Sequence, residues 1–153
     1  MNSLRGERFR IVQFSVQANH IHLIVEAAER ADLSNGMRAL NARIGKHVNC
    51  VLGRRGRLVS ERHHEHSLQS PRAVRHALCY VLANFKKHPT REGRRGDPLD
   101  PYSSARFFPG FAEQVNTGAC AQDVPVARPR TWLLRAGWQQ HGLISIYEAP
   151  RSH

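Results

Sequence analysis

Alternating apolar and polar positions near the N-terminus predict a β-hairpin. The segment "RFRIVQFSV" (8–16) repeats apolar residues at every second position, which is the period of a β-strand. These apolar positions are Val12, Phe14 and Val16. The segment "HIHLIVEA" (20–27) predicts a second strand, and the intervening "QAN" predicts a tight turn.

The second strand carries two histidines on one face. Side chains two residues apart on a strand point to the same side, so His20 and His22 lie together. The other face is apolar and consists of Ile21, Leu23 and Val25. Two neutral imidazoles at this spacing are placed to share one divalent metal ion. The alternative is a pair of core histidines satisfied by hydrogen bonds.

Spacings of three and four residues predict a first amphipathic helix over 32–52. Asp32 or Ser34 can cap its start, and Gly53 can cap its end. Its apolar stripe consists of Leu33, Met37, Leu40, Ile44, Val48 and Val51. Its other face carries Arg38, Arg43, Lys46 and His47.

A second helix begins at Ser70-Pro71, an N-cap followed by proline at the first helical position. It ends near His88, before Pro89. Its buried stripe consists of Val74, Leu78, Val81, Leu82 and Phe85.

A polar face of this second helix carries Tyr80 and Asn84, which are four residues apart and therefore neighbours. His76 and Lys87 extend the same polar face. Taken alone, the pattern also fits an ordinary half-buried tyrosine at a contact between a helix and a sheet.

The remaining segments predict a strand over 56–68, a loop after Pro89 and a short helix over 130–141 that ends at Gly142. We expect the tail to dock on the core through Trp132, Leu133 and Trp138, with stacking of a tryptophan on a nucleic-acid base as the alternative. The chain would then consist of a domain of residues 1–90 and a loop-rich tail of residues 91–153.

Charge narrows the class of partner. The 153 residues include 23 Lys or Arg and 12 Asp or Glu, for a net charge of +11. Such a surface favours polyanions, above all nucleic acid. A basic protein from an arginine-rich proteome is the alternative.

Cysteine use and hydropathy indicate a cytoplasmic location with no membrane partner. Cys50, Cys79 and Cys120 are odd in number and scattered, which fits reduced thiols. No apolar run approaches the ~20 residues of a membrane span, and "MNSLRGERFR" has no apolar signal region.

These features combine into one chemical hypothesis. His20 and His22 would hold a metal ion, and Asn84 would add an oxygen ligand, a mixture that suits Mg²⁺ or Mn²⁺ better than a closed zinc site. Tyr80 would attack a phosphodiester beside that ion, which leaves a phosphotyrosine and a free hydroxyl. A later hydroxyl could then reseal the strand.

The motifs "NHIHLIV" and "ALCYVLANFKKH" together resemble the single-tyrosine HUH transposases of insertion sequences. The chain looks most similar to their REP-associated tyrosine transposases. The similarity runs from about Phe9 to His88, and the tail "RPRTWLLRAGWQQHGLI" also resembles one subgroup.

The resemblance implies an α+β fold, with a ferredoxin-like antiparallel sheet and helices packed on one face. It implies metal ligation by His20 and His22, a nucleophilic Tyr80, and Asn84 at the third polar position. It also implies single-stranded hairpin DNA as substrate and Mg²⁺ or Mn²⁺ as cofactor. The implied phosphate contacts are Arg38, Arg43, Lys46, Arg54, Arg55, Arg57 and Lys87. His64 aligns with a histidine of the family pattern, without an assigned role.

One feature departs from the family pattern. Family members usually begin with an extra strand and helix before the segment that matches 8–16, whereas here only about ten residues precede it. We therefore expect the first strand of the sheet to be missing, which would leave backbone groups of the sheet unpaired.

Three other functions are open at the level of sequence. A basic DNA-binding remnant of such a transposase would need only cations and stacking groups. A histidine-triad hydrolase would need a third histidine where this chain has Ile24, and a zinc module built on "HHEH" lacks a cysteine at ligand spacing. A monomer and a homodimer are both compatible with the sequence.

Overall fold

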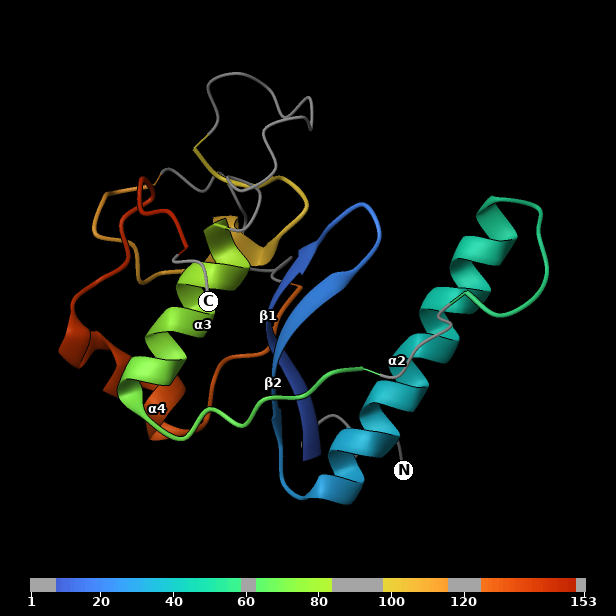
Figure 1. Cartoon of the computed structure of the whole chain (residues 1–153), viewed down its shortest axis with the longest axis horizontal. Helices are drawn as coiled ribbons and strands as arrows, with labels where there is room; N and C mark the ends of the chain where they lie inside the picture. The colour runs from blue at the N-terminus through green and yellow to red at the C-terminus, as the bar shows by residue number, and fades with distance from the viewer. Residues whose placement is uncertain (1–7, 59–62, 84–97, 116–124, 151–153) are drawn as a thin grey trace. The chain divides into compact units, whose positions relative to one another are not determined.

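The computed structural model describes residues 8–58, 63–83, 98–115 and 125–150. These residues form a two-stranded antiparallel sheet, helices and short 3-10 turns (Figure 1). The elements are β1 (Phe9–Val16), β2 (Ile21–Ala27), α2 (Arg30–Val51), α3 (Pro71–Ala83), the 3-10 helix η2 (Ser104–Phe107), α4 (Trp132–Arg135) and the 3-10 helix η3 (Gly137–His141). The predicted α+β class is confirmed.

The chain divides into two compact units that alternate along the sequence. The first unit comprises Met1–Phe9 and Ala27–Ser67, and it contains α2. The second comprises Arg10–Glu26 and Leu68–His153, and it contains most of the hairpin, α3 and the C-terminal elements. The expected boundary near residue 90 stays a prediction, because residues 84–97 lie outside the described part of the chain.

β1 and β2 form the predicted hairpin. The backbone N–H of Gln17 donates to the carbonyl oxygen of His20 at 2.8 Å, which places these residues opposite each other across the turn. Directly opposed residues of an antiparallel pair point to the same face. His20 and His22 therefore share their face with Ser15 and Gln17 of β1.

The face of β2 that carries the histidines also contributes to the core. Ile24 follows His22 on that face and is only 4% exposed, whereas Ile21 on the apolar face is 41% exposed. Val74 and Leu78 of α3 belong to the same buried cluster as Ile24. A helix that packs on this face brings its own side chains next to the histidines.

α3 begins where the sequence predicts. Pro71 is its first residue, and the hydroxyl oxygen of Ser70 accepts a hydrogen bond from the N–H of Ala73 at 3.2 Å, as an N-cap does. Its buried residues are Val74, Leu78, Cys79, Val81, Leu82 and Ala83. The predicted buried residues of this helix that the structure describes are thus confirmed. Phe85 and the expected end of the helix near His88 lie outside the described residues.

The C-terminal segment supplies a large share of the core of the second unit. Its buried apolar residues are Leu99, Ala105, Phe108, Trp138, Ile144 and Ile146. The single helix expected over 130–141 is divided into α4 and η3, because the backbone leaves helical geometry at Ala136 (φ −143°, ψ −37°). Trp138, after this break, is 2% exposed, whereas Trp132 before it is 56% exposed.

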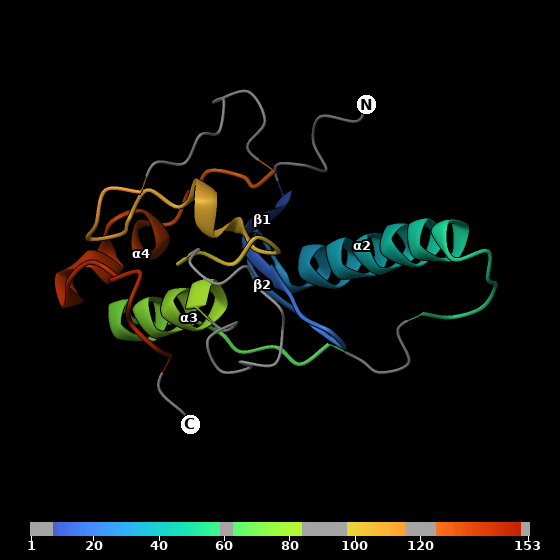
Figure 2. The ribbon, with the colours of Figure 1, turned by 90° about the horizontal axis from the view of Figure 1, so that it is seen from above.

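A segment expected to be plain loop bonds to the outer edge of β1. The carbonyl oxygen of Tyr102 accepts a hydrogen bond from the N–H of Val16 at 2.8 Å. The hydroxyl oxygen of Ser104 accepts a second one from the N–H of Phe14 at 2.9 Å. Figure 2 shows η2 beside β1. These backbone groups of β1 are therefore paired, contrary to the expectation of an unpaired edge.

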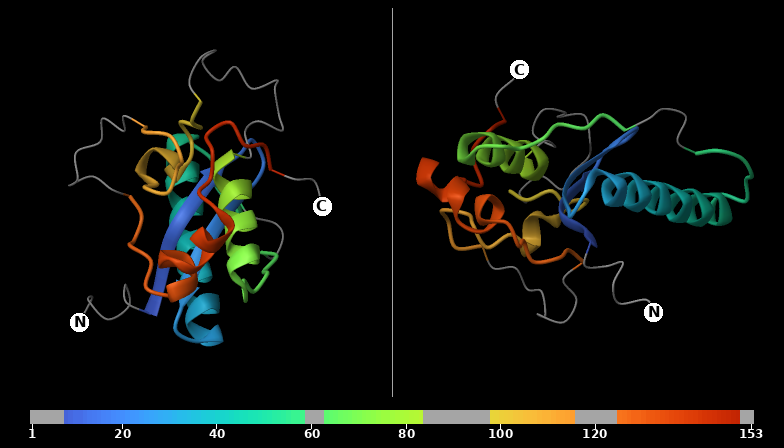
Figure 3. Two further views of the ribbon diagram at one scale, coloured as in Figure 1. Left: turned by 90° about the vertical axis from the view of Figure 1, so that its left-hand side faces the viewer. Right: turned by 90° about the horizontal axis from the view of Figure 1, so that it is seen from below.

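α2 is one long helix (Figure 3). The structure describes all of its residues, and none of them is fully buried. It begins at Arg30, earlier than expected, and its N-cap is Glu29 rather than Asp32 or Ser34. Its predicted end is confirmed. Gly53 follows the C-cap with φ of 60°, a left-handed conformation that glycine adopts without steric cost.

The strand expected over 56–68 is wrong for the part of that segment that the structure describes. Residues 63–69 have no regular secondary structure, and residues 59–62 lie outside the described part. The sequence "HHEH" places four polar residues in a row, which leaves neither face of a strand with an apolar set to bury. Glu65 in this segment instead forms an ion pair with Arg30 at 3.2 Å.

A bidentate ion pair holds the C-terminal segment on α3. Both terminal nitrogens of Arg75 donate to the carboxylate of Glu148 at 2.8 Å, and the same guanidinium donates to the carbonyl oxygens of Gly142 and Leu143. The hydrogen bond from Arg75 holds the pKa of Glu148 below its ordinary value, against the opposing effect of burial. Glu148 is therefore stabilised in its ionised form.

We expect Arg75→Ala to lower the free energy of unfolding by about 2 kcal/mol at neutral pH, because charge-assisted hydrogen bonds are lost. The pKa of Glu148 is lower in the folded than in the unfolded state, so the unfolded state takes up the proton first as the pH falls. The contribution of the pair is complete above about pH 5 and is lost as the pH falls through the folded-state pKa.

Urea unfolding of both proteins at neutral pH and at a series of values below about pH 5 measures this effect. The stability difference between wild type and Arg75→Ala should shrink as the pH is lowered. A difference that stays constant over the series would show that the pair does not couple to protonation of Glu148.

Candidate functional site

His20 and His22 converge on one point at the start of β2. Their Nε2 atoms are 2.9 Å apart, and their ring centroids are 4.6 Å apart with the planes at 78°. His20 is exposed and His22 is partly buried. The two predicted ligand residues are thus brought together in the structure.

Asn19, in the hairpin turn, orients the ring of His20. Its Oδ1 lies 2.6 Å from Nδ1 of His20. A side-chain carbonyl oxygen only accepts, so Nδ1 carries the proton and Nε2 of His20 keeps its lone pair. Such an outer bond is the means by which proteins orient a ligating histidine.

α3 places the ring of Tyr80 against His22. The two ring centroids are 4.9 Å apart, and the planes meet edge to face at 83°. Tyr80 is partly buried and packs against the core cluster. Leu78 and Val81, on adjoining positions of α3, are 1% and 5% exposed. At about 3.6 residues per turn, Tyr80 is turned about 200° from Leu78 and about 100° from Val81. It therefore meets His22 from another side of the helix than these two buried residues.

The environment of His22 favours its neutral form. Burial lowers the pKa of His22, and a positive charge on the neighbouring His20 lowers it further. A neutral imidazole keeps one nitrogen lone pair, which is what a metal ligand needs.

The histidine pair fits a divalent metal ion as two adjacent ligands. Adjacent ligands of an octahedral ion with bonds of ~2.1 Å are about 3 Å apart, and the two Nε2 atoms are 2.9 Å apart. Within the described residues, no group of three His, Cys, Asp or Glu side chains is arranged around one metal position. Among the described His, Cys, Asp and Glu side chains, the candidate ligands at this point are therefore the two imidazoles. Asn84, the predicted third ligand, lies outside the described residues.

The predicted phosphate contacts belong to the first unit, apart from Lys87, which lies outside the described residues. All six are exposed: Arg38, Arg43, Lys46, Arg54, Arg55 and Arg57. Three of them line one pocket: Arg38, Lys46 and Arg57. His64 is exposed in the same unit, and the structure gives it no role.

A buried chain of polar residues near the tip of the hairpin was missing from the sequence-based prediction. Nε2 of Gln17 donates to the hydroxyl oxygen of Ser15 at 2.6 Å, and that hydroxyl donates to the carboxylate of Asp100 at 3.3 Å. The three residues are 7%, 0% and 2% exposed. The available signal was the "DPYSS" segment, because Asp and Ser next to proline favour local turns, but the partners on β1 are remote in sequence.

Comparison of the chain with protein-family models, with curated proteins and with solved structures finds no match. The resemblance to HUH transposases therefore stays a prediction that rests on the two sequence motifs. No helix in the described part of the chain combines the length and the hydropathy needed to span a membrane.

Proposed function

We propose that this protein cuts and rejoins single-stranded hairpin DNA through a covalent phosphotyrosine on Tyr80. One observation carries the proposal: the ring of Tyr80 contacts His22, whose Nε2 meets that of His20. The fold thus brings the phenol ring of Tyr80 from α3 to a pair of potential metal ligands from the hairpin. The net charge of +11 supports a polyanionic partner.

In the proposed reaction, the hydroxyl oxygen of Tyr80 attacks a phosphorus atom of the DNA backbone. A bond forms between this oxygen and phosphorus, and the bond from phosphorus to one sugar oxygen breaks. The phenol loses one proton, and the released sugar hydroxyl gains one. One strand end is then linked to the protein and the other carries a free hydroxyl, so a hydroxyl can reverse the step and reseal the strand.

The residues around Tyr80 would prepare the site for this reaction. His20 and His22 would hold Mg²⁺ or Mn²⁺, with Asn84 as a further oxygen ligand. Bound there, the cation would offset the negative charge of the phosphodiester and orient it. Asn19 contacts Nδ1 of His20, so that Nε2 keeps the lone pair that would bind the cation, and burial favours the neutral form of His22.

A covalent adduct tests the proposal. The full-length protein is incubated with an end-labelled oligonucleotide that forms a hairpin with a single-stranded flank, in the presence of Mn²⁺, and is run on a denaturing gel. We expect labelled DNA to migrate with the protein, and we expect EDTA or a fully duplex oligonucleotide to abolish that band. Tight binding of the hairpin without an adduct at any Mn²⁺ concentration would refute the enzyme and favour a DNA-binding remnant.

A further inference from the structure

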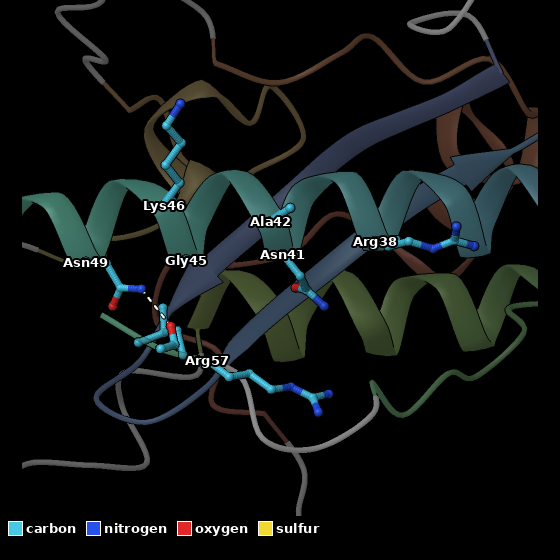
Figure 4. A pocket seen from close by; sticks show the side chains of 9 residues that line it. Arg38, Asn41, Ala42, Gly45, Lys46, Asn49 and Arg57 are labelled. Carbon is cyan, nitrogen blue, oxygen red and sulfur yellow. Dashed lines mark hydrogen bonds between the residues drawn. The ribbon is translucent and has the colours of Figure 1, made fainter. Parts of the chain in front are cut away.

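One face of α2 and the loop that follows it enclose a pocket of about 390 Å³ in the first unit. Its lining residues are Arg38, Asn41, Ala42, Gly45, Lys46 and Asn49 from the helix, and Gly56, Arg57 and Leu58 from the loop. Figure 4 shows Asn41 and Asn49 on the side of the helix that faces Arg57, whereas Lys46 extends away from them. The pocket is therefore built from one helix face and a returning loop.

Hydrogen bonds fix the loop to the helix, so the pocket is preformed. Nδ2 of Asn49 donates to the carbonyl oxygen of Gly56 at 2.7 Å, and the N–H of Arg54 donates to the carbonyl oxygen of Asn49 at 3.0 Å. Gly53 and Gly56 have φ of 60° and 108°. These left-handed conformations let the chain reverse direction and return along the helix.

The segment that forms the pocket carries only positive charge. From residue 33 to residue 58 the chain has six Lys or Arg residues and no Asp or Glu. Guanidinium groups such as those of Arg38 and Arg57 bind phosphate through two parallel hydrogen bonds. An anionic ligand that carries phosphate fits this lining.

The pocket is larger than a phosphate group requires, and its lining includes uncharged polar groups. Its volume of about 390 Å³ is in the range of sites for organic ligands, and a phosphate group would leave most of it empty. Asn41 lines the wall with a side-chain amide, a group that recognises base edges. A base carries the N–H donors and ring acceptors that a side-chain amide pairs with, whereas a phosphodiester offers no such edge.

We infer that this pocket binds one unpaired nucleotide of a nucleic-acid strand. The phosphate lies on the guanidinium groups of Arg38 and Arg57, and the base lies against Gly45 beside the side-chain amides. The inference rests on the proposed function only for the choice of DNA as the polymer. It also divides the six predicted cations that the structure describes into two classes: Arg38 and Arg57, which position a nucleotide, and the other four, which add charge around it.

Affinity measurements on matched variants test the inference. Fluorescence anisotropy reports binding of a labelled hairpin oligonucleotide with an unpaired flank, in a Tyr80→Phe background that prevents covalent trapping. We expect Arg57→Ala to weaken binding about tenfold, as loss of one good phosphate or base contact does. The control Arg54→Ala removes a neighbouring exposed arginine outside the pocket and should weaken binding no more than about threefold. Equal losses for the two variants would overturn the inference.

A second variant separates binding from folding. Leucine at position 45 would fill the pocket, because a Cβ added to Gly45 meets its nearest atom, on Leu58, only at 3.9 Å. Leucine is also the better helix former, so Gly45→Leu should melt no lower than wild type and yet lose binding about tenfold. Wild-type affinity in a folded Gly45→Leu protein would exclude the pocket as the site.

Competitors distinguish the nucleotide from its phosphate alone. Deoxyadenosine monophosphate should displace the labelled strand at lower concentration than inorganic phosphate, and equal potency would overturn the base-binding part. If Arg57→Ala weakens DNA binding but wild type forms no adduct in the presence of Mn²⁺, the proposed function is refuted and this inference stands. If wild type forms the adduct but Arg57→Ala binds DNA with unaltered affinity, this inference is refuted and the proposed function stands.

Discussion

Tyr80→Phe should abolish the covalent adduct and lower strand cleavage by roughly 10³-fold or more, since loss of a catalytic nucleophile typically costs at least that much. The substitution removes the hydroxyl oxygen and keeps the ring, which meets His22 edge to face. A phenylalanine ring can make the same contact. Folding, Mn²⁺ binding and hairpin binding should therefore stay within about twofold of wild type. Gel analysis of the adduct, thermal unfolding and anisotropy measure these properties separately.

The matched control is Tyr102→Phe. Tyr102 is 61% exposed and lies in the segment that pairs with β1, outside the contact between Tyr80 and His22. This variant should form the adduct at the wild-type rate. An adduct that persists in Tyr80→Phe but disappears in Tyr102→Phe would show that the nucleophile is Tyr102 and would contradict the role proposed for Tyr80.

His22→Ala should weaken Mn²⁺ binding by more than ~100-fold, because even outer partners of ligands contribute 10–100-fold. The variant should also lose strand cleavage, since the phosphodiester would no longer be oriented and its charge no longer offset beside Tyr80. Binding of hairpin DNA should be retained, because the predicted phosphate contacts that the structure describes belong to the first unit. Titration of Mn²⁺ followed by its electron paramagnetic resonance signal measures the first effect.

His141→Ala is the control for this second prediction. His141 is an exposed residue of η3 in the same unit as His22, so its removal subtracts one imidazole without touching the pair. Mn²⁺ titrations that superimpose for wild type and a folded His22→Ala protein would exclude the histidine pair as the metal site.

The local parts of the candidate site follow from sequence. Strand period alone puts His20 and His22 on one face, and the N-cap at Ser70 with Pro71 fixes where α3 begins. The apolar spacing of α3 also predicts that Leu78 and Val81 occupy the core, which the structure confirms.

The local sequence pattern did not predict which face of β2 packs against the core. Three alternating apolar residues favoured the face of Ile21, but Ile24 on the histidine face is the one that α3 covers. Which face a helix covers depends on partners remote in sequence, and this contact is what brings Tyr80 to His22. The sequence motifs implied the meeting of the two groups only through the resemblance to a family.

The tail illustrates the same limit. The sequence predicted one short helix over 130–141, yet the backbone breaks at Ala136, and Trp138 is buried whereas Trp132 is exposed. Ser104 reads as a loop residue, and its pairing with the backbone of Phe14 spans 90 positions of sequence. Side-chain hydroxyls that pair with a strand edge leave no periodic signal.

The most direct test of the central claim, that Tyr80 and the two histidines act on one phosphate, is mass spectrometry of the protein after reaction. Protein treated with hairpin DNA and Mn²⁺ is digested with nuclease and protease, and peptides that carry a nucleotide are identified. We predict one modified peptide, with the added mass on Tyr80, and no such peptide from His22→Ala. A nucleotide mass on Tyr102 or Tyr147, or cleaved DNA without any modified tyrosine, would contradict the account.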